Sequence, residues 1–357
     1  MSKINISNSV ITIGKSAFEG CNSLKNVILP ASIKSIGKLA FYACTSLKSI
    51  VIPNAVTQIN YGTFCDCINL ADISIPQSIN KIDVAAFKNT AWLKKKQKNN
   101  PLVIINDILI DATTCSGDLI IPENVTTISK GAFGPVNFYN FDSYNNSHIT
   151  SIVIPDSITR IEDGTFYNMN LKSIVIPDSI TYIGKQAFYK CNLAKVSLPE
   201  SITYIGAEAF YGCEYLTEIN IPESVTYIGA GAFYECSELE SIDLPNSIIN
   251  IYDSTFYCCY KLKTVELPDS LNYIGKQAFE HCISLTSITI PTVVTEIGDW
   301  SFDECKELSK VIIESPSITF GEDTFDRCNK DLTFISSDGS DTQKYARINK
   351  YKFIIKS

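Results

Sequence analysis

Hydrophobic residues recur along this chain at one fixed spacing. A Phe that follows a small residue occurs thirteen times, mostly at intervals of 23 residues and twice at intervals of 22. A constant period of this length is typical of solenoids, in which each repeat forms one coil and buries its apolar side against the next coil. The repeated residues are Phe18, Phe41, Phe64, Phe87, Phe133, Phe166, Phe188, Phe210, Phe233, Phe256, Phe279, Phe302 and Phe325.

Alternating apolar residues predict a short strand in each repeat. Ile219 and Ile221 are separated by one residue, so both side chains point to the same side of a strand. Pro222 lacks a backbone donor, and we expect it to end the strand at a turn. Stacked repeats would place these strands side by side in a parallel sheet.

The rest of the repeat supplies a corner and an interior. We expect Gly229 to permit the second corner, and Ala232 with Phe233 to form a short helical or 3-10 turn that drives one ring inward. Cys236 and Leu239 would then close the core. The predicted fold is a mainly β repeat solenoid: a parallel sheet with short helical or 3-10 turns, wound as a curved rod in a single domain.

The repeat Pro-x-Ser-Ile-x-x-Ile-Gly-x-x-Ala-Phe-x-x-Cys-x-x-Leu resembles that of the BspA-like leucine-rich-repeat proteins, from about Ile4 to about Phe334. Ordinary leucine-rich repeats place Leu and an Asn ladder where this chain has Ile, Pro and Ser, so the pattern is specific. The resemblance implies a surface-exposed, non-catalytic binding protein of the kind linked with adhesion to host matrix proteins or to other cells.

Two breaks in the repeat divide the chain into blocks. The intervals from Phe87 to Phe133 and from Phe133 to Phe166 are 46 and 33 residues, so each contains inserted sequence. We expect an N-terminal repeat block at 1–87, an insert with a helix and a hairpin at 88–121, a main repeat block at 122–334 with a loop insertion at 134–148, and a C-terminal cap at 335–357.

Composition and charge exclude several classes of protein. Hydrophobic residues make up 45% of the 357 residues and charged residues 19%, so the chain can bury a core. The net charge of −8 leaves no basic excess for nucleic acid. No apolar run approaches the ~20 residues that span a bilayer. The resemblance implies a cell-surface or extracellular location, but no secretory signal is visible, so a cytoplasmic location stays open.

The thirteen cysteines and two histidines are the candidate chemical groups. Ten cysteines stand three residues after the repeat Phe in one inward column, where we expect packed thiols. A metal could use Cys258, Cys259, His281 and Cys282, but neighbouring residues would point in opposite directions, so four ligands would not converge. No motif for a catalytic serine, a phosphate or a dinucleotide occurs. We therefore predict no enzyme activity, no cofactor and no metal.

The candidate binding surface consists of positions that a solenoid would expose. Tyrosines after the repeat Phe would either stabilise the column by stacking or offer aromatic contact area to a partner. Outward strand residues vary from coil to coil, which either encodes partner choice or reflects unconstrained exposure. The residues are Tyr167, Tyr189, Tyr211, Tyr234 and Tyr257 in the tyrosine column, Asn220, Asp243 and Glu266 with Val175, Ser197 and Thr289 on the strand face, and Phe138, Tyr139 and Tyr144 in the loop insertion.

These features predict a protein that binds its partner by summing many weak contacts along an extended surface. The partner would be a protein or glycan, which by resemblance belongs to a host or to a cell-surface matrix. We expect no nucleic-acid partner and no membrane insertion. The alternative is an intracellular scaffold that self-associates through its N-terminal edge, because the open edge of a parallel sheet can pair with another chain.

Overall fold

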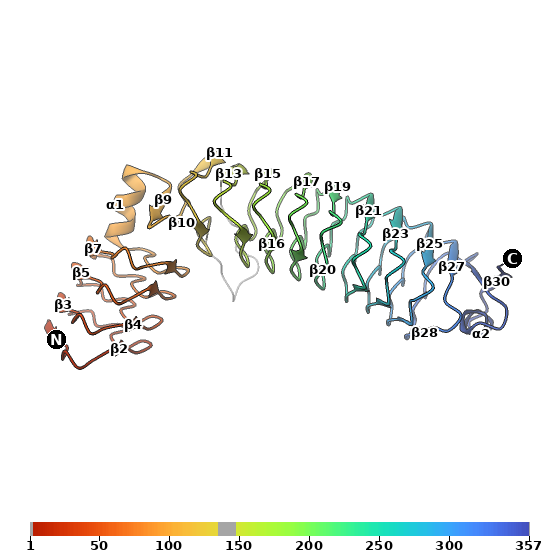
Figure 1. Cartoon of the computed structure of the whole chain (residues 1–357), viewed down its shortest axis with the longest axis horizontal. Helices are drawn as coiled ribbons and strands as arrows, with labels where there is room; N and C mark the ends of the chain where they lie inside the picture. Colours follow the sequence, from red (N-terminus) through yellow and green to blue (C-terminus); the bar gives the residue numbers. More distant parts are fainter. Residues whose placement is uncertain (1–2, 135–147, 357) are drawn as a thin grey trace. The chain divides into compact units, whose positions relative to one another are not determined.

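The computed structural model describes residues 3–134 and 148–356, which fold as a β-solenoid. Residue contacts divide the chain into two compact units. Unit 1 is formed by residues 1–116 and 122–148, and unit 2 by residues 117–121 and 149–357. In each unit, successive coils lie side by side (Figure 1). The predicted repeat solenoid is therefore confirmed.

Unit 1 begins with four coils whose first strands form a parallel sheet in the order β1–β3–β5–β7. Each residue pairs with the residue one repeat later, as Lys3 does with Asn26 and Ser49 with Asp72. A second set of short strands lies on the return path of the coils. The strands are β1 (Lys3–Asn5), β3 (Asn26–Ile28), β5 (Ser49–Val51) and β7 (Asp72–Ser74) in the sheet, and β2 (Thr12–Ile13), β4 (Ser35–Ile36), β6 (Gln58–Ile59) and β8 (Lys81–Ile82) on the return path.

A helix and a hairpin follow these coils in unit 1. The helix α1 (Ala91–Asn99) begins after Thr90, whose hydroxyl accepts the Leu93 N–H at 3.1 Å. The strands β9 (Val103–Ile105) and β10 (Ile108–Asp111) pair antiparallel, and β10 pairs in parallel with β12 (Thr127–Ile128). The Gln97 amide donates to the Asp111 carboxylate at 2.9 Å, which links α1 to β10.

Unit 2 is a longer run of regular coils. Its first strands pair in the orders β11–β13–β15, β17–β19, β21–β23 and β25–β27–β29–β30, and its return-path strands in the orders β14–β16–β18–β20 and β22–β24–β26–β28. The first set is β11 (Ser116–Ile120), β13 (His148–Val153), β15 (Ser173–Val175), β17 (Lys195–Ser197), β19 (Glu218–Asn220), β21 (Ser241–Asp243), β23 (Thr264–Glu266), β25 (Ser287–Ile290), β27 (Lys310–Ile313), β29 (Thr333–Ser336) and β30 (Lys352–Ile355). The second set is β14 (Arg160–Ile161), β16 (Tyr182–Ile183), β18 (Tyr204–Ile205), β20 (Tyr227–Ile228), β22 (Asn250–Ile251), β24 (Tyr273–Ile274), β26 (Glu296–Ile297) and β28 (Thr319–Phe320).

The repeat Phe rings form a buried column in each unit. In unit 1, the ring centroids from Phe18 to Phe87 are 5.1 to 5.9 Å apart. In unit 2, the centroids from Phe166 to Phe325 are 5.0 to 5.6 Å apart, with nearly parallel rings. Each ring packs on those of adjacent coils, so the interior is shared between coils, as the repeat predicts.

The cysteine column lies beside the Phe column as free thiols. The Cys236 thiol donates to the Phe210 carbonyl at 3.3 Å, and the Cys282 thiol to the Phe256 carbonyl at 3.2 Å, in each case one coil earlier. Burial raises the pKa of Cys191 to about 12. Burial also raises the pKa of Cys236 and Cys282, so these three thiols are protonated core groups, and each adds one hydrogen bond between coils.

The glycine of the Ile-Gly pair has a different role from the one expected. Gly229 does not have a positive φ, so the corner needs no special backbone freedom there. A Cβ at Gly229 would instead lie 2.3 Å from the backbone N of Ala207 in the preceding coil. The residue is glycine because two backbones approach closely, which corrects the expectation.

Left-handed residues flank the repeat Phe on both sides. Ser254 and Cys258, two residues before and after Phe256, have φ of +55° and +57°, and the same two positions are left-handed in coil after coil. Between them, the Phe256 N–H donates to the Ala278 carbonyl of the next coil at 2.8 Å. The segment that was expected to be a short helical turn is thus a series of hydrogen-bonded turns, in which alternate amides bond to the neighbouring coil.

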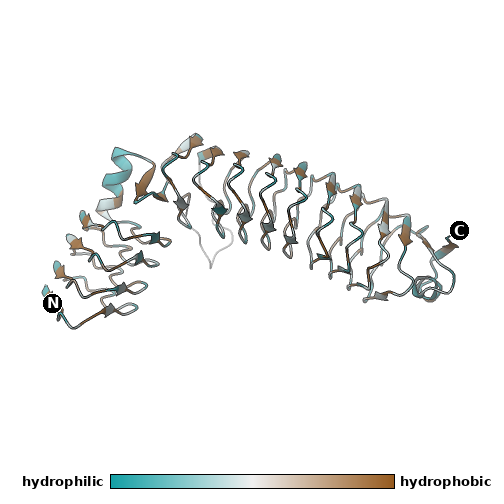
Figure 2. Cartoon of the chain, viewed as in Figure 1, coloured by the Kyte–Doolittle hydropathy of each residue, from teal (hydrophilic) through white to brown (hydrophobic). Residues whose placement is uncertain are grey.

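The C-terminal coils of unit 2 are covered by α2 (Asp341–Ile348) and β30. Ser340 accepts the Gln343 N–H at 3.2 Å at the start of the helix. The Tyr345 ring stacks on Phe320 with centroids 4.1 Å apart, and the Tyr351 hydroxyl donates to the Phe325 carbonyl at 3.0 Å. Figure 2 shows hydrophobic residues gathered in the strands and hydrophilic residues along much of α1.

Candidate binding surfaces

The strand face of unit 2 carries an exposed aliphatic patch, formed by Ile120, Val153 and Val175. Val153 and Val175 are paired residues of β13 and β15, with 37% and 58% of their surface exposed. Ile120 of the adjacent strand β11 is 72% exposed, whereas the inward Ile152 is 1% exposed. Contiguous exposed aliphatic side chains of this kind mark contact surfaces.

Beyond the aliphatic patch, the same outward column becomes polar. The side-chain oxygen of Asn220 accepts the Leu198 N–H at 2.8 Å and its amide donates to the Leu198 carbonyl at 3.0 Å, so this residue holds two coils together. Asp243 and Glu266 are exposed at paired positions on β21 and β23. Of the other predicted strand-face residues, Ser197 and Thr289 are also exposed, and Asp243 and Glu266 supply the charged groups that could meet a partner.

The tyrosines that follow the repeat Phe form one continuous stack. The ring centroids of neighbours are 4.4 to 4.7 Å apart and the rings are nearly parallel; the members are Tyr167, Tyr189, Tyr211, Tyr234 and Tyr257. Tyr189 is only 7% exposed, and burial raises its pKa to about 12. Since each ring face is covered by the next ring, the stack stabilises the coils and offers a partner only ring edges and hydroxyls.

A second row of tyrosines lies on the return-path strands. Tyr182, Tyr204 and Tyr227 stack with centroids 4.8 and 4.7 Å apart. The guanidinium of Arg160 lies 3.7 Å from the Tyr182 centroid and covers the free face of the first ring. This row too is closed by neighbouring residues rather than left open to a ligand.

The aromatic loop predicted as a contact region lies outside the described residues. This applies to Phe138, Tyr139 and Tyr144. The candidate surfaces within the described residues are the strand face and the tyrosine stack of unit 2 and, separately, a groove in unit 1.

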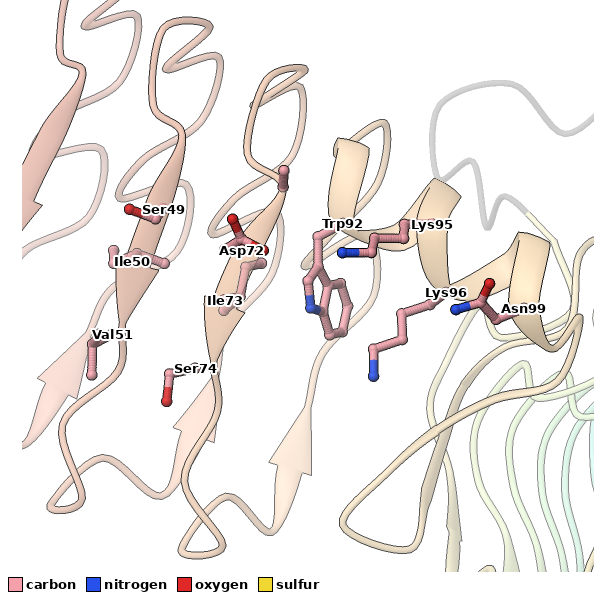
Figure 3. A pocket seen from close by; sticks show the side chains of 11 residues that line it. Ser49, Ile50, Val51, Asp72, Ile73, Ser74, Trp92, Lys95, Lys96 and Asn99 are labelled. Atoms are coloured by element: carbon pink, nitrogen blue, oxygen red, sulfur yellow. The ribbon is translucent and has the colours of Figure 1, made fainter.

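The groove lies between the strand face of unit 1 and α1, has a volume of about 560 Å³ and was not expected from the sequence. Figure 3 shows its floor, the outer side of β5 and β7, and its wall, one face of α1. The helix residues are spaced i, i+3, i+4 and i+7, so they share this face. The side chains are Trp92, Lys95, Lys96 and Asn99 on α1, and Ser49, Val51, Asp72 and Ser74 on the strands.

The groove is rich in positive charge and hydrogen-bond donors. Lys95 and Lys96 extend from α1 beside the strands (Figure 3), and the Lys96 ammonium lies 5.6 Å from the centroid of the Trp92 ring. Trp92 is held in place because its ring packs on Phe87 with centroids 4.7 Å apart. Asp72 is the one carboxylate among the residues that line this groove. The arrangement suits an anionic ligand.

Two further kinds of site are absent from the part of the chain that the structure describes. Within residues 3–134 and 148–356, neither helix is long and apolar enough to cross a membrane. In the same ranges, no three His, Cys, Asp or Glu side chains are grouped as metal ligands would be.

Comparisons with known proteins agree with the repeat. A family model for the BspA type leucine rich repeat region matches in six copies, over residues 1–116, 138–263 and 203–333. The chain is 29% identical to a leucine-rich repeat protein from Bacteroides ovatus of known crystal structure, over 98% of this chain and 88% of that one, with a TM-score of 0.60.

Two other similar structures have lower TM-scores. A leucine rich cell surface protein from Faecalibacterium prausnitzii is 25% identical, over 94% of this chain and 85% of that one, with a TM-score of 0.43. A leucine-rich repeat protein from T. pallidum is 26% identical, over 57% and 85%, with a TM-score of 0.41. Comparison with curated proteins gives no match. On the family match, which covers most of its length, this chain belongs to the BspA-type leucine-rich repeat family.

Proposed function

We propose that this protein is a non-catalytic, cell-surface binding protein that recognises a protein partner through the strand face of unit 2. The aliphatic patch is the observation that carries the proposal. Ile120 and Val175 are 72% and 58% exposed on the two strands that flank β13, so with Val153 they form three adjoining exposed aliphatic side chains. Membership of the BspA-type family, with the adhesive role that the resemblance implies, supports both the binding role and the location.

The strand face can bind a partner by combining two kinds of contact. Covering the aliphatic patch would gain about 25 cal/mol for each Å² of apolar surface removed from water. Asp243 and Glu266, farther along the same column, would favour basic groups on the partner and thereby set its orientation. An apolar patch followed by two carboxylates fits a protein surface better than a glycan, so the proposal commits to a protein.

A pair of double variants tests this surface. Ile120→Ser with Val175→Ser removes most of the aliphatic patch, while Ile249→Ser with Val293→Ser makes the same chemical changes at residues that are 55% and 47% exposed elsewhere in unit 2. We expect the patch variant to bind about tenfold or more weakly to an immobilised panel of host matrix proteins, and the control to bind like the parent. Thermal unfolding confirms that both variants are folded.

Two results would overturn the proposal. The first is equal binding by the patch variant and the parent to every matrix protein that the parent retains. The second is failure of the parent to bind any protein on the panel. The location is tested separately by labelling intact cells with a membrane-impermeant reagent, which should modify this protein if it lies at the surface.

Self-association is a second candidate function, favoured by the first coil of unit 1. Val10 and Phe18 are only partly buried there, although Ile33 and Phe41, their equivalents one coil later, are fully buried. A second copy could cover these side chains and pair with β1. Light scattering over a concentration series tests this, because a particle mass that stays at one chain throughout would exclude the scaffold.

A further inference from the structure

We propose that the groove beside α1 binds an extended acidic peptide, which pairs as an additional strand with the edge of β7. The inference rests on the proposed binding function, but it assigns a separate site, in unit 1, and a partner of different chemistry. Each step depends on the described residues of β5, β7 and α1.

The first step is that β7 is an open edge. It is the last strand in the order β1–β3–β5–β7. The Asp72 N–H donates to the Lys48 carbonyl at 3.3 Å and the Ser74 carbonyl accepts the Ile52 N–H at 3.0 Å, so these two residues face β5 and the coil that carries it. Alternate residues of a strand direct their backbone groups to opposite sides. The N–H and carbonyl of Ile73 therefore face away from β5, and no backbone partner meets them within the described residues.

The second step explains why no further strand pairs with β7. One repeat beyond Asp72, the chain is in α1 instead of a strand. The Trp92 N–H still donates to the Leu70 carbonyl of the preceding coil at 2.7 Å, and from there the helix leaves the stack. The position that the next strand would occupy borders a groove of about 560 Å³. A peptide strand from a partner fits the place that the insert has left in the sheet.

The third step is the charge of the wall. The residues of α1 include Lys94, Lys95, Lys96 and Lys98, with no acidic residue in the first turn, in a chain of net charge −8. Lys95 and Lys96 line the groove, and Asp72 alone opposes them there. Figure 3 shows the indole nitrogen of Trp92 on the side toward β7, where its N–H can donate to a ligand. Two ammonium groups and an indole N–H favour a ligand that carries carboxylates.

The fourth step selects a peptide among anionic ligands. Ile73 offers both a donor and an acceptor at strand spacing, and an extended peptide is the ligand that satisfies both. Val51, 66% exposed on the floor, adds an apolar contact for alternate side chains. A sulfated glycan or an inorganic anion would use the lysines and leave the Ile73 backbone unused.

Isothermal titration calorimetry tests the charge part of the proposal. The whole protein is titrated with a short capped peptide of alternating valine and glutamate. We expect saturable binding that becomes about tenfold or more weaker when lysine replaces glutamate in the peptide, or in the Lys95→Glu, Lys96→Glu variant. The matched control is Lys94→Glu with Lys98→Glu, which makes the same charge change on the same helix outside the groove. This control should bind within about twofold of the parent. No binding of the peptide by the parent, or an equal loss of affinity in both variants, would overturn the proposed site.

The strand-pairing part is tested at Ile73. Ile73→Pro removes the N–H that faces the groove while leaving the bonds of Asp72 and Ser74 to the neighbouring coil, and Ile73→Ala makes a comparable loss of packing but keeps the N–H. We expect the proline variant to lose the peptide and the alanine variant to retain it, with both folded by circular dichroism. Equal binding by the two variants, or equal competition by sulfate or a sulfated oligosaccharide, would show an anion site without strand pairing and refute the proposal.

The proposal for the groove and the proposal for the aliphatic patch can be refuted independently of each other. The Ile120→Ser, Val175→Ser variant should bind the acidic peptide like the parent, because its changes lie in unit 2. Peptide binding without any matrix binding would uphold the groove and refute the proposed function. Matrix binding that depends on the aliphatic patch, with no binding of the peptide, would uphold the proposed function and refute the groove as a peptide site.

Discussion

Gly37→Ala should destabilise unit 1 because a methyl group at this position meets the backbone of the preceding coil. A Cβ at Gly37 would lie 2.6 Å from the Lys15 backbone N and 2.7 Å from the carbonyl carbon of Gly14, where ordinary contacts begin at 3.4 Å. The Gly37 N–H also donates to the Ile13 carbonyl at 2.8 Å, so the two coils cannot separate without weakening that bond. The substitution thus acts on the contact between coils.

The size of the effect follows from two opposing contributions. Forcing an extra methyl into a packed site costs about 1–3 kcal/mol, and replacing glycine by alanine gains about 0.4–1 kcal/mol by restricting the unfolded chain. We expect a net loss of about 1–2 kcal/mol. Asn60 occupies the equivalent position one coil later, but its amide compensates by donating to the Ile36 carbonyl at 2.6 Å, which alanine cannot do.

Gly14→Ala is the matched control. Gly14 holds the same repeat position in the first described coil, and a Cβ there would have no atom within 4 Å. It should therefore gain about 0.4–1 kcal/mol from the unfolded state alone. Urea unfolding monitored by Trp92 fluorescence, in a background that lacks Trp300, reports on unit 1. If Gly37→Ala is as stable as Gly14→Ala, the inference that the close approach of the coils excludes a side chain at Gly37 is wrong.

The other predictions concern single residues in the described coils. Ser254→Gly should raise the free energy of unfolding by about 1 kcal/mol, and Gly231→Ser should lower it by a similar amount. The reason is that both residues have positive φ, +55° and +61°, at the same repeat position. Urea titration measures both changes, and shifts of equal sign would contradict a left-handed requirement at this position. Phe233→Ala should cost about 3–5 kcal/mol because it leaves a cavity between two stacked rings, and a loss below about 1 kcal/mol would show that the column does not carry the core. Burial raises the pKa of Asp111, so ionisation of this carboxyl opposes folding as pH rises. Asp111→Asn should therefore be at least as stable as the parent at neutral pH, and the difference in stability should vanish as the pH falls through the raised pKa. Melting temperatures measured over a pH series test this, and a difference that grows on acidification would refute it.

The repeat could be predicted from sequence because each coil places the same residue in the same environment. The Phe and Cys columns follow directly from the 23-residue period, and the structure confirms them as stacked interiors. The role of Gly229 could not be read in this way. A glycine in a pattern indicates either an unusual φ or a close approach, and only the position of Ala207 in the neighbouring coil decides between them.

The binding surfaces were less accessible to sequence reasoning. The pattern showed that tyrosines recur after the repeat Phe, but whether their faces are free depends on centroid distances of 4.4 to 4.7 Å between coils. The groove could not be foreseen, because its floor belongs to regular coils that include Asp72, whereas its wall belongs to α1, in an insert whose path breaks the repeat. The available signal was the helical spacing of Trp92, Lys95 and Lys96 within an otherwise β sequence.

The measurement that tests the stacked-coil architecture most directly is the deletion of one whole coil from unit 2. Removing residues 207–229 joins Gly206 to Ala230 and restores the Ile-Gly-x-x-Ala-Phe pattern across the junction. We expect this variant to fold with a cooperative urea transition and the circular dichroism of the parent, whereas removal of residues 207–217, about half a coil, should abolish that transition. Equal behaviour of the two deletions would contradict the account.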